Sequence, residues 1–167
     1  MPYLKQVQIG IDYIEANLDD DISLSRVASE AGLSQWHFQR IFKALTNPQE
    51  RVRWWGAEGR FQVTYMESDL RPGGKWMMRG IGIGGKPFIV SGVYSEIDRP
   101  RLLAFTWLPD WQEHATESLV RIDLEEKGGA TTVRLTHSGL TSEGARASHR
   151  GWPDILAWLQ SHVERTA

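Results

Sequence analysis

One short stretch of the chain carries side chains whose types and spacing suit contact with DNA. They are Trp36, Gln39, Arg40 and Lys43. Their i, i+3, i+4 and i+7 spacing puts them on one face of a helix. Arginine can bond guanine through two nitrogens, glutamine can pair with adenine, and an aromatic ring can contact a thymine methyl group. The pattern favours base reading by Trp36, Gln39 and Arg40, whereas Gln35 and Lys43 are better explained, on their own, as solvated polar residues.

The helix that must position this face also has an apolar side, formed by Phe38, Ile41, Phe42 and Leu45. Two further helices are predicted before it. The first spans residues 3–18, where apolar residues repeat with helical period. Ser23 caps the second and Gly32 ends it, after which Ser34 caps the third. Two helices joined by a tight glycine turn predict a helix-turn-helix.

The string SLSRVASEAGLSQWHFQRIFKALT resembles the first helix-turn-helix of the AraC/XylS family of bacterial transcription regulators. The resemblance covers about the first 46 residues, and we expect residues 1–46 to form an AraC-like head. It implies that Trp36, Gln39 and Arg40 enter the major groove of duplex DNA. Lys43 and the backbone amides near Ser34 would then face phosphate. The predicted DNA-binding set is Ser34, Gln35, Trp36, Gln39, Arg40 and Lys43.

The chain departs from that family in having one such motif where the family has two. Residues 1–47 carry four Lys or Arg against six Asp or Glu, a net charge of −2. We therefore expect weak DNA affinity from a monomer. A homodimer would supply two reading heads; otherwise the motif is a relic.

Other motifs in the sequence resemble sites of phosphate binding, metal binding or catalysis, but the residues around them do not fit those sites. Residues 80–85, GIGIGG, fit a phosphate-binding glycine loop, but Pro87 replaces the needed Ser or Thr and strand-like residues follow. We therefore expect a hairpin turn. The five histidines lack metal-ligand spacing, and the sequence has neither a nucleophile elbow nor a recognisable pair of catalytic carboxylates. We expect no enzymatic activity, no metal and no cofactor.

From residue 47 onward the pattern changes to strands. Asn47 and Pro48 begin a short helix that ends before Gly56. Six strands are then predicted, over 61–70, 75–79, 88–97, 102–107, 119–125 and 132–138, with Gly- or Pro-rich turns between most of them. Short connections imply an antiparallel sheet. Residues 141–163 form a helix that Pro153 should kink near His149. The fold class is α+β.

The strings RWWG, DLRPGGKW, GVYSEIDRPRLLAFTW, TVRLTHSGL and GWPDILAWL resemble the SRPBCC (START-like, Bet v 1-like) superfamily. Within this superfamily, they resemble most the bacterial branch that is related to the activator of the heat-shock-protein-90 ATPase. The resemblance implies a helix-grip domain over residues 47–167, a curved sheet around a long C-terminal helix, with a cavity for a small apolar ligand. The predicted cavity lining is Trp54, Trp55, Trp76, Val90, Tyr94, Phe105, Trp107, His137 and Trp152.

Ordinary core packing explains each of these residues taken singly, and His137 is better explained as a hydrogen-bonded core histidine. Only the collective excess of tryptophan favours a pocket. The family's first strand is absent from the predicted elements, because FKALTN is shared with the recognition helix. An unpaired sheet edge or an open cavity would result, and a homodimer could cover it.

The chain has no cysteine and no long apolar run, so we expect a cytoplasmic protein without disulfides or membrane contact. The leading hypothesis is a DNA-binding transcription regulator whose helix-grip domain senses a small hydrophobic ligand. The alternative is a ligand-binding or chaperone-cofactor-like SRPBCC protein with a vestigial N-terminal motif. A recombined reading frame with no settled role is a third possibility.

Overall fold

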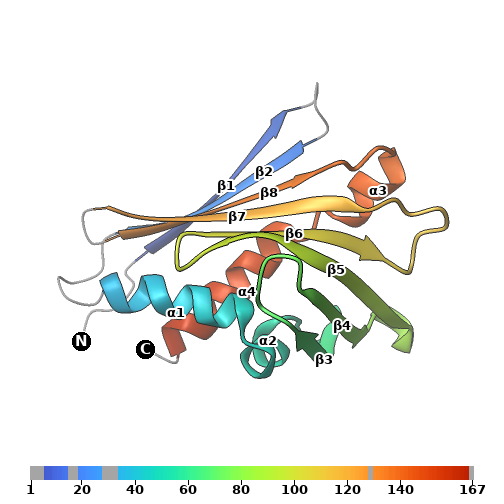
Figure 1. The fold of residues 1–167 in the computed structure, drawn as a ribbon, viewed down its shortest axis with the longest axis horizontal. Coiled ribbons are helices and arrows are strands. Elements are labelled where there is room, and N and C mark those ends of the chain that lie inside the picture. Colours follow the sequence, from blue (N-terminus) through green and yellow to red (C-terminus); the bar gives the residue numbers. More distant parts are fainter. Residues whose placement is uncertain (1–5, 15–18, 28–33, 128–129, 166–167) are drawn as a thin grey trace.

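A computed structural model describes the backbone of residues 6–14, 19–27, 34–127 and 130–165, and side chains from Phe38 onward. An eight-stranded antiparallel sheet curves around a layer of helices (Figure 1). Its strand order is β1-β2-β8-β7-β6-β5-β4-β3. The strands are β1 (Gln6–Ile14), β2 (Asp19–Val27), β3 (Gln62–Ser68), β4 (Lys75–Ile81), β5 (Pro87–Asp98), β6 (Leu102–Pro109), β7 (Ser118–Lys127) and β8 (Ala130–Ser138). The helices are α1 (Ser34–Thr46), α2 (Pro48–Trp54), η1 (Ile83–Gly85), α3 (Glu143–Ser148) and α4 (Trp152–Arg165).

The six predicted strands after residue 60 are confirmed as β3 to β8. They follow one another through antiparallel pairings, as the short connections predicted. The glycine-rich stretch 80–85 turns the chain from β4 into β5 through η1. Gly84 and Gly85 have φ of 75° and 78°, a backbone region that glycine adopts at little cost. The sheet of a helix-grip fold is therefore present.

The two helices predicted before residue 32 are wrong over the residues the structure describes. Residues 6–14 and 19–27 form β1 and β2, while residues 28–33 lie outside the described chain. The sequence of β1, QVQIGIDYI, places apolar residues at every second position as well as at helical spacing. Antiparallel pairing of β2 with β8 decides between the two periods, because it supplies long-range hydrogen bonds. Of the three-helix head, only α1 is observed.

The prediction that the sheet lacks its first strand is wrong for the same reason. β2 pairs with β8 from Asp20 opposite His137 to Ser25 opposite Thr132, and β1 pairs with β2. The N-terminal strands therefore cover the edge of β8.

Local capping fixes the helices after residue 46. The Asn47 side chain accepts hydrogen bonds from the backbone N–H of Gln49 and Glu50, at 3.0 and 3.1 Å, and so begins α2 as predicted. The predicted C-terminal helix is divided into α3 and α4. Pro153 is the second residue of α4, where its missing N–H costs nothing. The chain is thus broken at residues 149–151 rather than kinked.

The core lies between the sheet and the helices α1, α2 and α4 (Figure 1). α1 packs against α4, β7 and β8. Its described part contributes four buried apolar residues, Ile41, Phe42, Ala44 and Leu45. The predicted domain boundary between residues 46 and 47 stays a prediction. No helix in the described part of the chain is long and apolar enough to cross a membrane.

Candidate functional site

The outer face of α1 presents part of the predicted DNA-binding set. Gln39 is exposed, and the side chain of Lys43 is 68% exposed. Lys43 lies 3.9 Å from a carboxylate oxygen of Glu50. Arg40 is half-buried, and burial lowers the pKa of its guanidinium although the charge of Glu50 partly opposes this. The side chains of the other three members, Ser34, Gln35 and Trp36, lie outside the described residues.

The nine predicted cavity-lining residues are all buried. None is more than 3% exposed. The aromatic rings among them contact one another: Trp55 stacks on Trp54 with ring centroids 5.1 Å apart, and Trp107 lies 5.3 Å from Trp152. They therefore form one packed cluster inside the domain, under the sheet and beside α4.

His137 is the polar centre of this cluster. The indole Nε1–H of Trp152 donates to Nδ1 of His137 at 3.1 Å. Nδ1 therefore carries no proton, and the neutral ring must hold its proton on Nε2, which lies 2.8 Å from the hydroxyl oxygen of Ser118. The Ser118 hydroxyl in turn donates to the carbonyl of Trp107 at 3.2 Å.

A second buried histidine completes the network. Trp107 Nε1–H donates to Nε2 of His149 at 2.9 Å, and Nδ1 of His149 lies 2.7 Å from the carbonyl of Ala145. The two imidazole rings are 4.9 Å apart. Burial, reinforced by the nearby His149, lowers the pKa of His137 to about 3. Burial therefore holds His137 neutral. In the described part of the chain, the tautomer set by Trp152 makes Nε2–H of His137 a donor toward Ser118, so this ring cannot remove the Ser118 proton.

Arg51 on α2 is a buried cation, only 2% exposed. Its guanidinium carbon lies 4.0 Å from the ring centroid of Trp55 and 5.6 Å from that of Trp76. Nη1 donates to the carbonyl of Leu45 at 3.2 Å, whereas Nε and the indole Nε1 of Trp76 have no hydrogen-bond partner. Burial lowers the pKa of Arg51 to about 10, partly offset by Tyr94. Two unpaired donors thus lie within the aromatic cluster.

The sequence interpretation missed Arg51, Ser118 and His149. Arg51 had a detectable signal, because it stands three and four residues before Trp54 and Trp55 and therefore on the same helical face. Ser118 and His149 are 31 residues apart in the chain and come together at the lining of one cavity, so no local pattern marks them.

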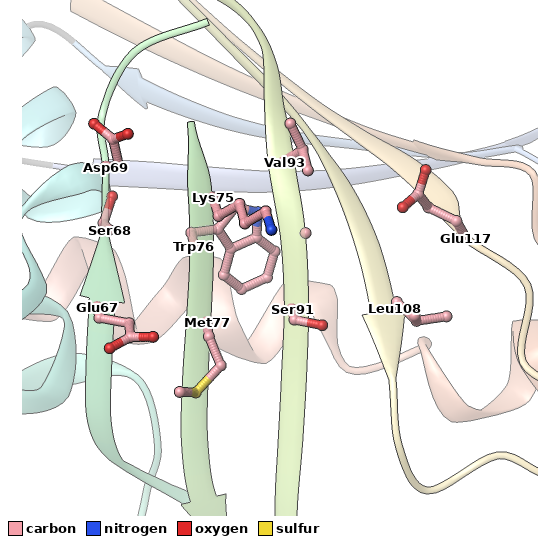
Figure 2. Close-up of a pocket in the computed structure, with 11 residues that line it drawn as sticks. Glu67, Ser68, Asp69, Lys75, Trp76, Met77, Ser91, Val93, Leu108 and Glu117 are labelled. Carbon is pink, nitrogen blue, oxygen red and sulfur yellow. The ribbon is translucent and has the colours of Figure 1, made fainter. Parts of the chain in front are cut away.

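Three surface cavities border these elements. The first, of about 570 Å³, lies over β3 to β6, with Glu67, Met77, Ser91 and Leu108 on neighbouring strands (Figure 2). The second, of about 660 Å³, lies between α1 and the ends of β3 and β5 and includes Gln39 and Lys43. The third, of about 200 Å³, is lined by Ser118, His149 and polar loop residues.

Of the predicted cavity-lining residues, only Trp76 borders any of these three cavities, and it borders the first. Within the described residues, no three His, Asp or Glu side chains gather as a metal site.

Comparison with known proteins gives matches of two kinds, the first to a family model and to solved structures. The family model described as Activator of Hsp90 ATPase homolog 1-like protein matches residues 37–164. The crystal structure of protein Ms6760 from Mycobacterium smegmatis is similar with a TM-score of 0.75 and 17% identity, over 96% of each chain. That of the AHSA1 protein from Silicibacter pomeroyi is similar with a TM-score of 0.66 and 24% identity, over 88% of this chain and 99% of that one.

Two curated proteins of Escherichia coli K12 are similar over a short segment. The multiple antibiotic resistance protein MarA is 47% identical over 36 residues, 22% of this chain and 28% of MarA. The right origin-binding protein is 50% identical over 34 residues, 20% of this chain and 12% of that protein. The similarity to MarA supports the AraC-like resemblance of the N-terminal part. The chain spans well under a third of either relative.

Proposed function

This chain belongs to the Activator of Hsp90 ATPase homolog 1-like family, and we propose that it combines the helix-grip domain of that family with DNA binding, as a transcription regulator. The observation that carries the proposal is the short, strong similarity to MarA and to the right origin-binding protein, whose name states what it binds. The proposal assigns base reading to Trp36, Gln39 and Arg40, the pattern of the predicted recognition helix.

The two faces of α1 support this proposal. One face buries Ile41, Phe42 and Leu45 in the helix-grip core, which holds the helix rigidly. The other face turns Gln39 and Lys43 to solvent. A rigid helix with exposed amide and ammonium groups suits entry into a major groove, where those groups can bond base edges and phosphates.

Ligand sensing is the second part of the proposal. α1 packs on α4, β7 and β8, and of these elements α4 carries Trp152 and β8 carries His137 of the aromatic cluster. A small apolar ligand that separates the sheet from α4 would therefore move α1 with respect to the rest of the domain. Differential affinity of the ligand for two such arrangements is what couples it to DNA.

A homodimer is proposed as the DNA-binding form. One helix makes few phosphate contacts, whereas two copies about 34 Å apart would reach successive major grooves. A protein that stays monomeric on DNA at micromolar concentration would contradict this part.

The alternative is a ligand-binding or chaperone-cofactor-like protein without DNA binding. The pairing of β2 with β8 favours it, because the N-terminal residues then serve to complete the sheet. In either case we propose that the protein is not an enzyme. The Ser118–His137 pair supports this, since the tautomer set by Trp152 leaves Ser118 without a base.

The test is fluorescence anisotropy of labelled duplexes selected from a random pool. We expect saturable binding that weakens steeply with salt, and at least a tenfold loss in the double variant Trp36→Ala, Arg40→Ala. Arg150→Ala is the matched control, because Arg150 is exposed and follows the last residue of α3 by two positions. The helix α3 lies far from α1 (Figure 1). Equal affinity of the double variant and the wild type would favour the alternative.

A further inference from the structure

The cavity between α1 and the ends of β3 and β5, named here the α1–β5 groove, is a site of its own. Its volume of about 660 Å³ is that of a small-ligand pocket. Phe42 and Leu70 supply an apolar wall, and Lys43 and Arg99 lie on its borders. It is separate from the buried aromatic cluster predicted to hold a ligand.

The charge of this groove is one-sided. Both charged residues that line it, Lys43 and Arg99, are cations and exposed, and no carboxylate among the described residues lines it. The nearest counter-charge shown is Glu50, 3.9 Å from the ammonium of Lys43, a long contact at a mostly exposed side chain. The groove therefore keeps a positive potential.

Arg51, the buried cation of the aromatic cluster, is linked to the groove wall through its neighbours. Arg51 donates to the carbonyl of Leu45, the residue next to Thr46 in the groove wall. Ser68, also in the wall, hydrogen-bonds the hydroxyl of Tyr94 at 2.6 Å, and Tyr94 interacts electrostatically with Arg51. No ion pair found among the described residues includes Arg51, so its charge is not cancelled locally. A buried charge is screened less than an exposed one.

We infer that the α1–β5 groove binds a small amphipathic anion, with its carboxylate or phosphate between Lys43 and Arg99 and its apolar body against Phe42 and Leu70. The two cations favour a negatively charged ligand. The apolar wall favours a ligand that also has a hydrocarbon portion. Binding of the anion is inferred from the groove alone. A role of this anion in regulation rests on the proposed function, DNA binding.

The consequence concerns DNA. Gln39 and Lys43 belong both to this groove and to the exposed face of α1. A bound anion would occupy the partners that DNA needs, so anion and duplex would exclude each other. Each would weaken the affinity of the other by the same factor, as linkage requires.

The experiment is a titration of the ¹⁵N-labelled full chain followed by amide chemical shifts. The probes are sodium octanoate, 1-octanol and inorganic phosphate. We expect octanoate to shift the amides of Lys43, Ser68 and Arg99 and to bind more tightly than either other probe. Arg99→Gln should weaken octanoate about fivefold, the effect of one charge pair in water. Arg53→Gln, an exposed arginine of α2 that does not line the groove, should change nothing.

The inference is overturned if 1-octanol binds as tightly as octanoate, if the shifts fall on the buried cluster instead, or if Arg99→Gln binds like the wild type. Duplex anisotropy on the same samples keeps the two proposals apart. Octanoate binding without DNA binding would contradict only the regulator, and DNA binding without octanoate binding would contradict only the groove. If both bind, saturating octanoate should lower duplex affinity.

Discussion

The indole N–H of Trp152 donates to Nδ1 of His137, 3.1 Å away, inside the sheet-and-helix core. This bond is possible only while Nδ1 is unprotonated. Because Nε2 of the same ring faces Ser118, one tryptophan on α4 fixes both the charge and the tautomer of a histidine on β8. The contact ties the closing helix to the sheet.

Acid should therefore destabilise the protein in a defined pH window. The pKa of His137 is about 3 in the folded state, against 6.5 as its ordinary value. Below pH 6.5 the imidazole of residue 137 binds a proton in the unfolded chain but stays neutral in the folded chain. The free energy of unfolding therefore falls as pH falls, and this loss ends near pH 3. Between these two pKa values, one such group lowers the free energy of unfolding by about 1.4 kcal/mol for each unit by which the pH falls.

Urea unfolding between pH 7 and 5.5, above the range of ordinary carboxylates, measures this slope. His137→Gln should flatten it by about 0.6 proton on average over this range. His114→Gln, at an exposed loop histidine, is the control. An unchanged slope in His137→Gln would refute the assignment.

Trp152→Phe should lower the free energy of unfolding by about 1–3 kcal/mol, because it leaves the buried Nδ1 of His137 without a donor. Trp111→Phe is the control, since that ring is 44% exposed and no hydrogen bond of its indole N–H is found in the described part of the chain. Chemical denaturation compares the two. Equal losses in the two variants would contradict a stabilising role of the hydrogen bond between Trp152 and His137.

Arg51→Met should raise the free energy of unfolding by about 1 kcal/mol or more. The cation is buried with one hydrogen bond and no carboxylate in ion-pair range among the described residues, and a flexible apolar chain can fill the same space. Arg53→Met, on the exposed side of the same helix, should change stability by less than about 0.5 kcal/mol. A strongly destabilised Arg51→Met would show that its contacts with Trp55 and Leu45 outweigh the cost of burial.

Gly92→Ala should destabilise the sheet by about 1–3 kcal/mol. A Cβ at this position would lie 1.9 Å from the carbonyl oxygen of Thr106 and 2.7 Å from Nε1 of Trp76, so β5 must shift. Gly151→Ala is the control, because nothing lies within 4 Å of its added carbon. Thermal unfolding of both variants checks this, and equal melting temperatures would contradict it.

The sequence predicts the helix-grip sheet well for two reasons. Apolar residues such as Val120 and Ile122 alternate along the strands, and glycine- or proline-rich turns separate most of the strands. It fails over β1, where QVQIGIDYI satisfies a helical and a strand period at once and only pairing beyond the segment decides. The polar core residues were missed for a related reason. Burial of Arg51 and the meeting of Ser118 with His137 depend on contacts distant in the chain, which no local pattern records.

The most direct test of the account is to titrate the ¹⁵N-labelled protein with its selected duplex at low salt and map the amide shifts. The account predicts saturable shifts concentrated on the exposed face of α1, at Gln39 and Lys43, with the buried residues Ile41 and Leu45 little affected. Absence of saturable shifts, or shifts confined to strands remote from α1, would contradict the claim that this helix both braces the domain and contacts DNA.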